Sequence, residues 1–456
     1  MPILPIDTGR YGSPEMRRIF DEENRLQKML DVEAALAWAH SQVGNIPKED
    51  AQKIVEKASI RYVKLERVKE IENEIRHDVM ALVSALAEAC GASGEYVHLG
   101  ATSSDMLDTA TALQLKEAVY LIEERLNELE SVLLVRAEKH KMSIMMGRSH
   151  GQHALPTTFG FKVAVWTREV SRQIQRLKDC KGRLLAGKMS GAVGTQAGLG
   201  PEALKIQELV MERLGICATD ISTQIVQRDR YAELTCILAI LASTLDNIAS
   251  EIRELQRPEI AEAFEAFEQK KQVGSSTMPH KRNPMISERI CGLAKLLRSL
   301  VTPALQNVPT WHERDLTQSS CERFVIPEEC ILIEYMLILM TRVLKGLKVD
   351  ETRMRKNMEI TQGRMMSEAV MLTLAKKGLG RQKAHELTRE LTIKSHNKQQ
   401  AFKTVLAENS IVKELLNLDE IKKVMDPQNY LGTAPRQIEL VIEKTRQERK
   451  ARGLSD

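Results

Sequence analysis

Long stretches of the chain repeat apolar residues every three or four positions, which is the period of an α-helix. The clearest stretch contains Leu113, Leu115, Val119, Ile122, Leu126, Leu129 and Leu133. A second contains Leu234, Ile237, Ile240, Leu241, Leu245 and Ile248. Residues 161–185 and 284–305 carry the same pattern, whereas alternating β-branched runs between turn pairs are scarce. The pattern therefore predicts an all-α protein.

The apolar stripes are too wide and irregular for a strict heptad repeat. We therefore expect a bundle of packed helices rather than an extended two-stranded coiled coil. Near the N-terminus, Ser13 is suited to cap a helix, Pro14 to begin it and Gly44 to end the pattern. Glycine and polar residues interrupt the helical pattern at 91–105, 146–158, 186–200 and 274–284. We expect functional residues in these loops.

The apolar stripes shorten and charged residues become more frequent after about residue 349. This change predicts a smaller C-terminal helical domain, with the last residues, 444–456, as a solvated tail. The predicted division is an N-terminal helical domain at 1–108, a central long-helix bundle at 109–349 and a C-terminal helical domain at 350–456.

Charge and cysteine content narrow the class of protein. The 66 Lys and Arg residues nearly balance the 62 Asp and Glu residues, so a global field that attracts nucleic acid is not expected. The seven cysteines form no Cys-x-x-Cys pair, which indicates reduced thiols in the cytoplasm. The most hydrophobic run, 331–340, is much shorter than the roughly 20 residues that span a bilayer. The first residues have no basic segment followed by a sustained apolar stretch, so a cleaved signal peptide is not expected. We expect a cytoplasmic protein without a membrane partner.

Residues 274–284, with the sequence GSSTMPHKRNP, place two serines, a histidine and two cationic residues between a glycine and a proline. Such a loop is able to fold over an anion, although a surface turn with solvated basic residues is the ordinary alternative. Its spacing does not match a nucleotide-binding P-loop, and it lacks the Gly-x-Ser-x-Gly pattern of a hydrolase nucleophile.

Three separate blocks of the sequence together resemble the fumarase and aspartase superfamily. They are 98–104 (HLGATSS), 147–158 (GRSHGQHALPTT) and the 274–284 loop. The resemblance covers essentially the whole chain. It implies an all-α, three-domain fold with a long central bundle, and an enzyme that cleaves a C–N or C–O bond with release of fumarate. It also implies a homotetramer with a 20-helix core, in which each active site draws blocks from three subunits.

Three further segments resemble one branch of that superfamily, which releases fumarate from succinylated purine nucleotides. They are 10–16 (RYGSPEM), 76–80 (RHDVM) and 311–323 (WHERDLTQSSCER). The carboxymuconate cycloisomerase branch is the nearest alternative, but it is not expected to keep the phosphate-binding pair Arg10 and Tyr11. A catalytically silent homologue, of the kind found among lens crystallins, is a second alternative. The argininosuccinate-cleaving branch fits these segments poorly.

The reaction of this branch removes a proton from the carbon beside a carboxylate and protonates the departing nitrogen. The resemblance implies that Ser275 is the general base, assisted by Lys281, and that His150 is the general acid. It also implies that Glu288 orients His150 and that His77 assists at the substrate. Without the resemblance, a turn serine, a buried structural histidine and a charged helix face are the ordinary interpretations of Ser275, His150 and His77.

The same resemblance implies a substrate-binding set rich in cationic groups, which suits a ligand with a phosphate and two carboxylates. Its members are Arg10, Tyr11, Arg76, His77, Asp78, Thr102, Ser103, Gln224, Ser276, Lys281, Arg282, Asn283, Arg289, Arg314, Ser319 and Arg323. His150 and His153 lie three residues apart, but no carboxylate or thiol accompanies them at a zinc-ligand spacing. We expect neither a metal nor a cofactor.

Overall fold

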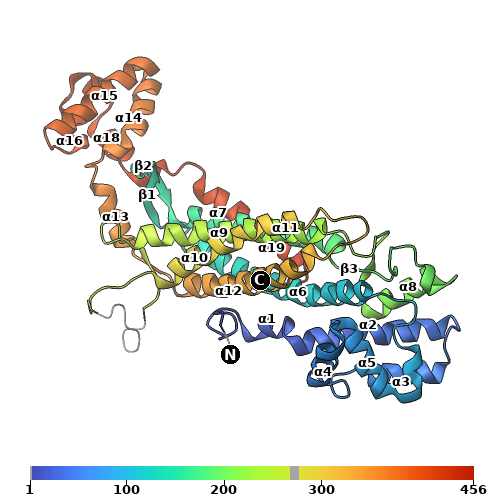
Figure 1. The fold of residues 1–456 in the computed structure, drawn as a ribbon. Coiled ribbons are helices and arrows are strands. Elements are labelled where there is room, and N and C mark those ends of the chain that lie inside the picture. Colours follow the sequence, from blue (N-terminus) through green and yellow to red (C-terminus); the bar gives the residue numbers. More distant parts are fainter. Residues whose placement is uncertain (1–2, 268–276, 456) are drawn as a thin grey trace. The chain divides into compact units, whose positions relative to one another are not determined.

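The computed structural model describes residues 3–267 and 277–455, and helices dominate it, as predicted (Figure 1). The chain forms two compact units. The first contains residues 1–127, 173–245 and 292–338, and the second contains 128–172, 246–291 and 339–456. The division into domains at 108 and 349 stays a prediction. All seven cysteines are free, in agreement with the expected reduced thiols.

The N-terminal helices of the first unit begin and end where local signals place them. They are α1 (Pro14–Ile19), α2 (Glu22–Gln42), α3 (Lys48–Lys57), α4 (Leu65–Ile75) and α5 (Asp78–Cys90), joined by α8 (Ala203–Leu214). The hydroxyl of Ser13 accepts the backbone N–H of Met16 at 3.0 Å, and Gly44 has a φ of +81° just after α2. Both predicted boundaries are confirmed. Helices α2, α3, α4, α5 and α8 share one apolar core.

Five long helices contribute residues to both units. They are α6 (Ser103–Lys139), α7 (Phe159–Leu184), α9 (Asp229–Gln256), α10 (Met285–Ser299) and α12 (Thr317–Gly346). The predicted apolar stripe of α6 is buried along its whole length. In α9 the prediction is wrong for Ile240, which is 45% exposed. Ile237 and Leu241 stand one turn apart and take the buried positions, so Ile240 falls on the flank of the stripe.

Helix α9 is long and apolar enough to cross a membrane by length and composition alone, but 67% of its most apolar window is buried inside the protein. A core helix has the same properties. The predicted continuous helix over 284–305 is instead divided at Leu300 into α10 and α11 (Val301–Gln306).

The structure also contains short strands, and one pair replaces a predicted loop. β1 (Ile144–Ser149) and β2 (Gln152–Thr158) form an antiparallel hairpin across the 146–158 interruption. Two minimal pairs join β3 (Ala186–Gly187) to β4 (Cys217–Ala218), and β5 (Ala263–Phe264) to β6 (Lys348–Val349). The sequence pattern did not predict this hairpin, because its strands have few alternating β-branched residues and β2 contains Pro156.

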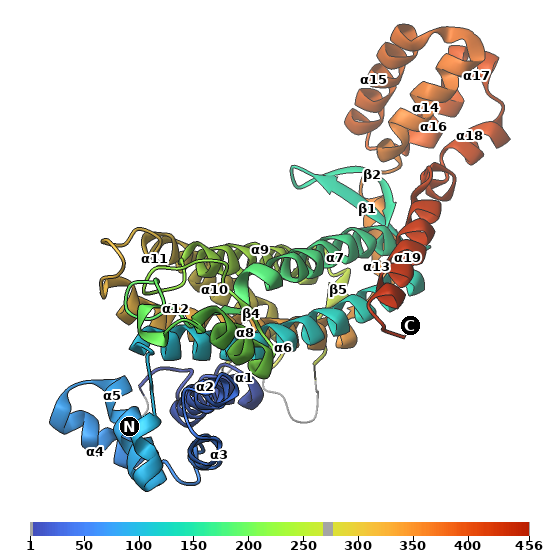
Figure 2. The same ribbon diagram turned by 90° about the vertical axis from the view of Figure 1, so that its right-hand side faces the viewer.

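The C-terminal part of the second unit has a core of its own. After α13 (Glu351–Glu359), it contains α14 (Ser367–Leu374), α15 (Arg381–Asn397), α16 (Phe402–Glu408), α17 (Ser410–Leu415) and α18 (Leu418–Val424). Figure 2 shows α14 to α18 gathered in one group. The prediction of a solvated tail at 444–456 is wrong, because most of these residues belong to the final helix, α19 (Ala434–Ala451). Arg449 and Arg452 both form ion pairs with the buried Glu130.

Candidate active site

The predicted site residues fall in both compact units, and the first unit brings one group of them together around a pocket of about 610 Å³. Three of the quoted sequence segments meet there, since the lining comes from the α4–α5 corner, the start of α6 and the start of α12. The predicted members are Arg76, His77, Asp78, Ser103, Arg314, Ser319 and Arg323.

A tight corner between α4 and α5 presents Arg76 and His77. Arg76 ends α4 in the left-handed conformation with φ of +58°, which is uncommon for a residue other than glycine. His77 caps α5, and its Nδ1 accepts the backbone N–H of Met80 at 3.3 Å. In the neutral ring this acceptor role places the proton on Nε2. The corner therefore presents both residues at the pocket.

Asp78 fixes one cation of the pocket. One of its carboxylate oxygens accepts from Arg323 at 2.9 Å, and the other accepts the backbone N–H of Val79 at 2.8 Å. Arg323 lies on α12, one helical turn after Ser319. The predicted role of Asp78 in substrate binding stays a prediction, but its contact shows that it holds the Arg323 guanidinium in place.

Arg314 and Gln224 contact each other directly. An Nη of Arg314 donates to Oε1 of Gln224 at 3.0 Å, while the Gln224 amide nitrogen donates to the carbonyl of Ala192 at 2.7 Å. Asp315 orders the segment around Arg314 by accepting the backbone N–H groups of Trp311 and Thr317, each at 2.8 Å. Hydrogen bonding from Thr317, and then from Trp311, lowers the pKa of Asp315 to about 2.

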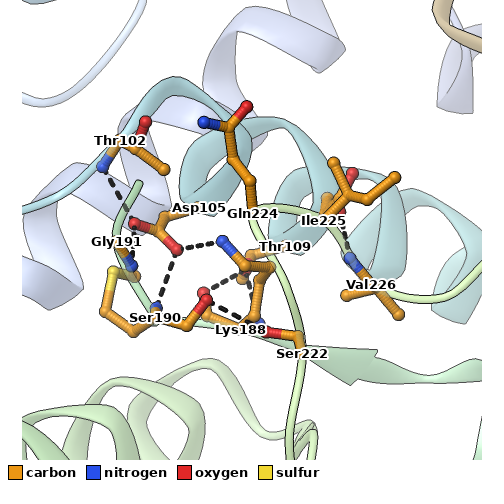
Figure 3. A network of polar contacts seen from close by, with 12 residues as sticks. Thr102, Asp105, Thr109, Lys188, Ser190, Gly191, Ser222, Gln224, Ile225 and Val226 are labelled. Atoms are coloured by element: carbon orange, nitrogen blue, oxygen red, sulfur yellow. Dashed lines mark hydrogen bonds and ion pairs between the residues drawn. The ribbon is translucent and has the colours of Figure 1, made fainter. Parts of the chain in front are cut away.

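Asp105 joins the start of α6 to the 186–192 segment (Figure 3). Its completely buried carboxylate accepts the backbone N–H groups of Thr102 at 2.9 Å, Ser190 at 2.9 Å and Gly191 at 3.2 Å. It also accepts from the ammonium group of Lys188, which is buried as well. This network fixes the backbone of Thr102 and hence the neighbouring Ser103.

Arg228 makes a second buried connection in the same unit. It forms two hydrogen bonds with Asp108, each at 2.9 Å, and two with Glu322, at 2.8 and 3.1 Å. Asp108 lies on α6 and Glu322 on α12. The two carboxylates balance the charge of the guanidinium, and their contacts connect the N-terminal parts of α6 and α12, which both line the pocket.

The sequence analysis quoted His98 only as part of a motif, but the structure gives it a specific environment. Its φ is +63°, and the nearly buried Glu33 accepts its backbone N–H at 3.1 Å and contacts its Nδ1 at 2.6 Å. Burial alone would lower the pKa of His98, but the hydrogen bond and charge of Glu33 raise it overall. Strained residues of this kind concentrate at functional sites.

Arg10 and Tyr11 are not among the described residues that line the pocket. Arg10 is exposed, and the ring of Tyr11 lies 5.9 Å from that of Tyr335 on α12. Their predicted contact with a phosphate stays a prediction.

In the second unit, His150 occupies the tip of the β1–β2 hairpin. His150 and Gly151 form a two-residue turn with φ values of +53° and +72°, which is the geometry of a type I′ turn. Asparagine and glycine are the usual residues at such positions, so histidine adds strain there. His150 is exposed, and the alternative interpretation as a buried structural histidine is wrong.

Close to its tip, this hairpin is anchored to a buried carboxylate. Arg148 donates two hydrogen bonds to Glu262, at 2.9 and 2.7 Å, and Asn357 donates a third at 2.8 Å. The Glu262 side chain is completely buried. Because Arg148 stands two residues before His150, this contact limits where the imidazole can lie.

The loop at 274–284 is described only from Thr277 onward, so Ser275 and Ser276 lie outside the described residues. Lys281 and Arg282 are exposed, and Gln256 donates to the backbone carbonyl of Arg282 at 3.1 Å. Helix α10 follows, and Glu265 accepts the backbone N–H groups of Ile286 and Ser287 at its start. A carboxylate at a helix N-terminus stabilises the helix.

Helix α10 carries two further predicted residues. Glu288, in its first turn, is exposed, and Arg289 is half-buried. Asn283 stands two residues before the helix and is half-buried. The predicted orientation of His150 by Glu288, and the carboxylate-binding roles of Asn283 and Arg289, stay predictions. Over residues 3–267 and 277–455, no cluster of His, Cys, Asp and Glu side chains has a metal-binding arrangement.

Comparison with known families matches two parts of the chain. Residues 9–296 match the lyase family, and residues 363–441 match the family described as adenylosuccinate lyase C-terminus. Among curated proteins, the adenylosuccinate lyases of Pyrococcus abyssi and Pyrococcus horikoshii are 52% and 53% identical, with complete coverage of this chain and of each relative. The adenylosuccinate lyase of Methanocaldococcus jannaschii is 47% identical over 97% of this chain and 96% of its own.

Solved structures give the same fold with lower sequence identity. The 3-carboxy-cis,cis-muconate lactonizing enzyme of Pseudomonas putida has a TM-score of 0.89 and 32% identity, over 97% of this chain and 99% of its own. A fumarate lyase from Mesorhizobium has a TM-score of 0.89 and 30% identity, over 97% of this chain and 100% of its own. These likenesses confirm the predicted superfamily fold.

Proposed function

The chain belongs to the adenylosuccinate lyase family and is a lyase, and we propose that it eliminates fumarate from adenylosuccinate to give AMP. It acts likewise on the succinylaminoimidazole carboxamide ribotide of purine synthesis, which carries the same succinyl group. The observation that carries the substrate assignment is the pocket of the first unit, where three arginines and a histidine meet.

This pocket suits an anionic ligand. Arg76, Arg314 and Arg323 line it together with His77, whereas its acidic lining residues are Glu72 and Asp78. Guanidinium groups bind phosphate and carboxylate oxygens through paired hydrogen bonds. A nucleotide with one phosphate and two succinyl carboxylates supplies the negative charge that this surplus of cations requires.

The second unit supplies the groups for bond cleavage. Ser275 removes the proton from the carbon beside the succinyl carboxylate, and Lys281 stabilises the charge that this step creates. As the C–N bond breaks, its electron pair goes to the departing nitrogen, and His150 donates a proton there. The exposure of His150 at a hairpin tip supports this role, because a general acid has to reach a bound substrate. Glu288 orients the imidazole.

We propose that the enzyme is a cytoplasmic homotetramer of three-domain subunits. Each active site combines blocks from three subunits, and the hairpin with His150 and the loop with Ser275 act there on the bound substrate. An enzyme of this type loses activity on dissociation, even when its monomers remain folded.

The alternative is a carboxymuconate cycloisomerase, which the likeness to the Pseudomonas putida structure favours. The sequence identity argues against it, because the chain is 32% identical to that enzyme and 52% identical to the adenylosuccinate lyase of Pyrococcus abyssi. A catalytically silent homologue is a further alternative. The presence of Ser275, His150 and Lys281 in the sequence argues against it.

The experiment that tests the proposal is an assay of purified protein with adenylosuccinate. We expect the substrate absorbance to decline without added metal or cofactor, and chromatography to identify AMP and fumarate as products. A folded tetramer that turns over neither adenylosuccinate nor the imidazole substrate would overturn the proposal. Turnover of a carboxymuconate in its place would establish the alternative.

A further inference from the structure

A small cavity of about 140 Å³ shares one wall with the active-site pocket of the first unit. Arg314, Ser319 and Arg323 line both spaces. The smaller one is lined in addition by Arg25 from α2 and by Ser104, which directly follows Ser103. The space accommodates a group of the size of a phosphoryl group.

Buried polar atoms without partners converge on this cavity. Within the described residues, Ser104 Oγ, Arg314 Nε and Gln318 Oε1 are buried and make no hydrogen bond. Ser104 and Gln318 are only 1% and 2% exposed. Buried polar groups in proteins are nearly always hydrogen-bonded, so such a group indicates a ligand or solvent at that position. Ser104 and Arg314 offer donors, which an anion accepts.

Arg25 adds a further positive charge to the cavity, and no carboxylate of the described residues is hydrogen-bonded to it. Its guanidinium makes no hydrogen bond to any described residue, and its neighbouring charges are Arg323, Asp78 and Glu22. Asp78 already binds Arg323, and Glu22 binds Lys69 at 2.5 Å. Burial, and then the repulsion from Arg323, lower the pKa of Arg25. By contrast, Arg228 in the same cavity is neutralised by Asp108 and Glu322.

We propose that Arg25 is an anion-binding residue of the active site and that it binds the phosphate monoester of the nucleotide substrate. The inference rests on the proposed function. A phosphate dianion accepts hydrogen bonds from several guanidinium groups and a hydroxyl at once, which a flat carboxylate does not do equally well. Arg25, Arg314 and Arg323 supply the guanidinium groups, and Ser104 and Ser319 supply hydroxyl groups.

The test is the Arg25→Gln variant of the full-length enzyme, with Arg18→Gln as the matched control, because Arg18 is an exposed arginine on α1. We expect KM for adenylosuccinate to rise on the order of tenfold or more in Arg25→Gln, since a charge-assisted hydrogen bond is lost. We expect kcat to change much less, and the control to match the parent enzyme. Inhibition by AMP should weaken by a similar factor, whereas inhibition by fumarate and by adenosine should stay unchanged.

Three results would overturn the inference while leaving the proposed function intact. The first is an unchanged KM in Arg25→Gln, and the second is that inhibition by AMP and inhibition by fumarate weaken equally. The third is a decrease in kcat without a change in KM. If Arg25→Gln does not fold, Arg25→Lys keeps the charge without the paired donors, and weaker AMP inhibition in that variant carries the same conclusion. A parent enzyme without activity on adenylosuccinate would instead overturn the proposed function.

Discussion

Lys188 donates to Asp105 in an ion pair in which neither side chain is exposed to solvent. The two residues are 83 positions apart in the sequence. The same carboxylate accepts backbone N–H groups of Thr102 and Ser190, so the pair connects the start of α6 to the loop that follows β3. The position of Ser103 at the active-site pocket depends on this buried contact.

Removal of the cation should therefore destabilise the first unit strongly. Lys188→Met leaves the Asp105 carboxylate buried without its partner, and we expect a loss of about 3–5 kcal/mol in the free energy of unfolding. Chemical denaturation at fixed protein concentration measures it. The control is Lys69→Met, which removes an exposed ion pair with Glu22 and should cost about 1 kcal/mol or less. Equal effects of the two substitutions would contradict the structural role of the pair.

The His150→Asn variant removes the imidazole from the hairpin tip while keeping a residue that suits the backbone conformation there. Asparagine tolerates the positive φ of this position better than most residues, so the hairpin and the thermal stability should be preserved. An amide cannot act as a general acid at neutral pH, and we expect kcat to fall by about 10²–10⁴-fold. Steady-state kinetics with adenylosuccinate provides the measurement. Nearly full activity in a stable variant would remove His150 from the acid role.

Arg148→Lys tests whether the anchor of the hairpin positions His150. Lysine cannot reproduce the paired hydrogen bonds to Glu262, so the hairpin loses its fixed orientation. Small displacements of a catalytic group cost up to about 10²-fold in rate, and we expect a lower kcat with a smaller change in KM. The exposed Arg172 on α7 provides the control variant Arg172→Lys. If both variants keep the parent kcat, the anchor does not position the acid.

Ser275→Ala tests the proposed base, which lies outside the described residues. Loss of the hydroxyl should abolish turnover, because no group remains at that position to take the proton from carbon. Binding of adenylosuccinate should be largely retained, since the cationic pocket belongs to other segments. Calorimetric titration and a turnover assay on the same preparation measure the two effects. Full activity would exclude Ser275 as the base.

Glu329 lies on α12 and is completely buried. We expect it to make the free energy of unfolding depend on pH. Burial raises its pKa from the model-compound value of 4.5 to about 8. Between these values the folded protein holds a proton that the unfolded chain releases, so the contribution of Glu329 to stability declines as pH rises through this window. The decline is at most about 1.4 kcal/mol per pH unit.

Glu329→Gln removes this titration, and its stability relative to the parent should increase from about pH 5 to about pH 8. Denaturation curves at several pH values measure the difference. Glu124→Gln, at a side chain that is 71% exposed, is the control and should give a nearly constant difference. Parallel pH dependences of Glu329→Gln and the parent would show that the carboxyl group is ionised in the folded protein.

The sequence by itself determined the helical class of the fold and the family. The stripe from Leu113 to Leu133 and the cap at Ser13 depend on interactions within one or two helical turns, so their pattern is written in neighbouring residues. The motif blocks identified the superfamily and drew attention to residues such as Arg76 and Arg323, which the structure brings to one pocket.

Only the tertiary structure decided the pairings that hold the site. Nothing near Lys188 or Asp105 in the sequence indicates that they meet, and the hairpin below His150 was read as a loop. Arg25 likewise has no carboxylate bound to it among the described residues, because Asp78 binds Arg323 and Glu22 binds Lys69. A buried charge is stable only beside a partner, and the assembled backbone selects that partner across many residues of sequence.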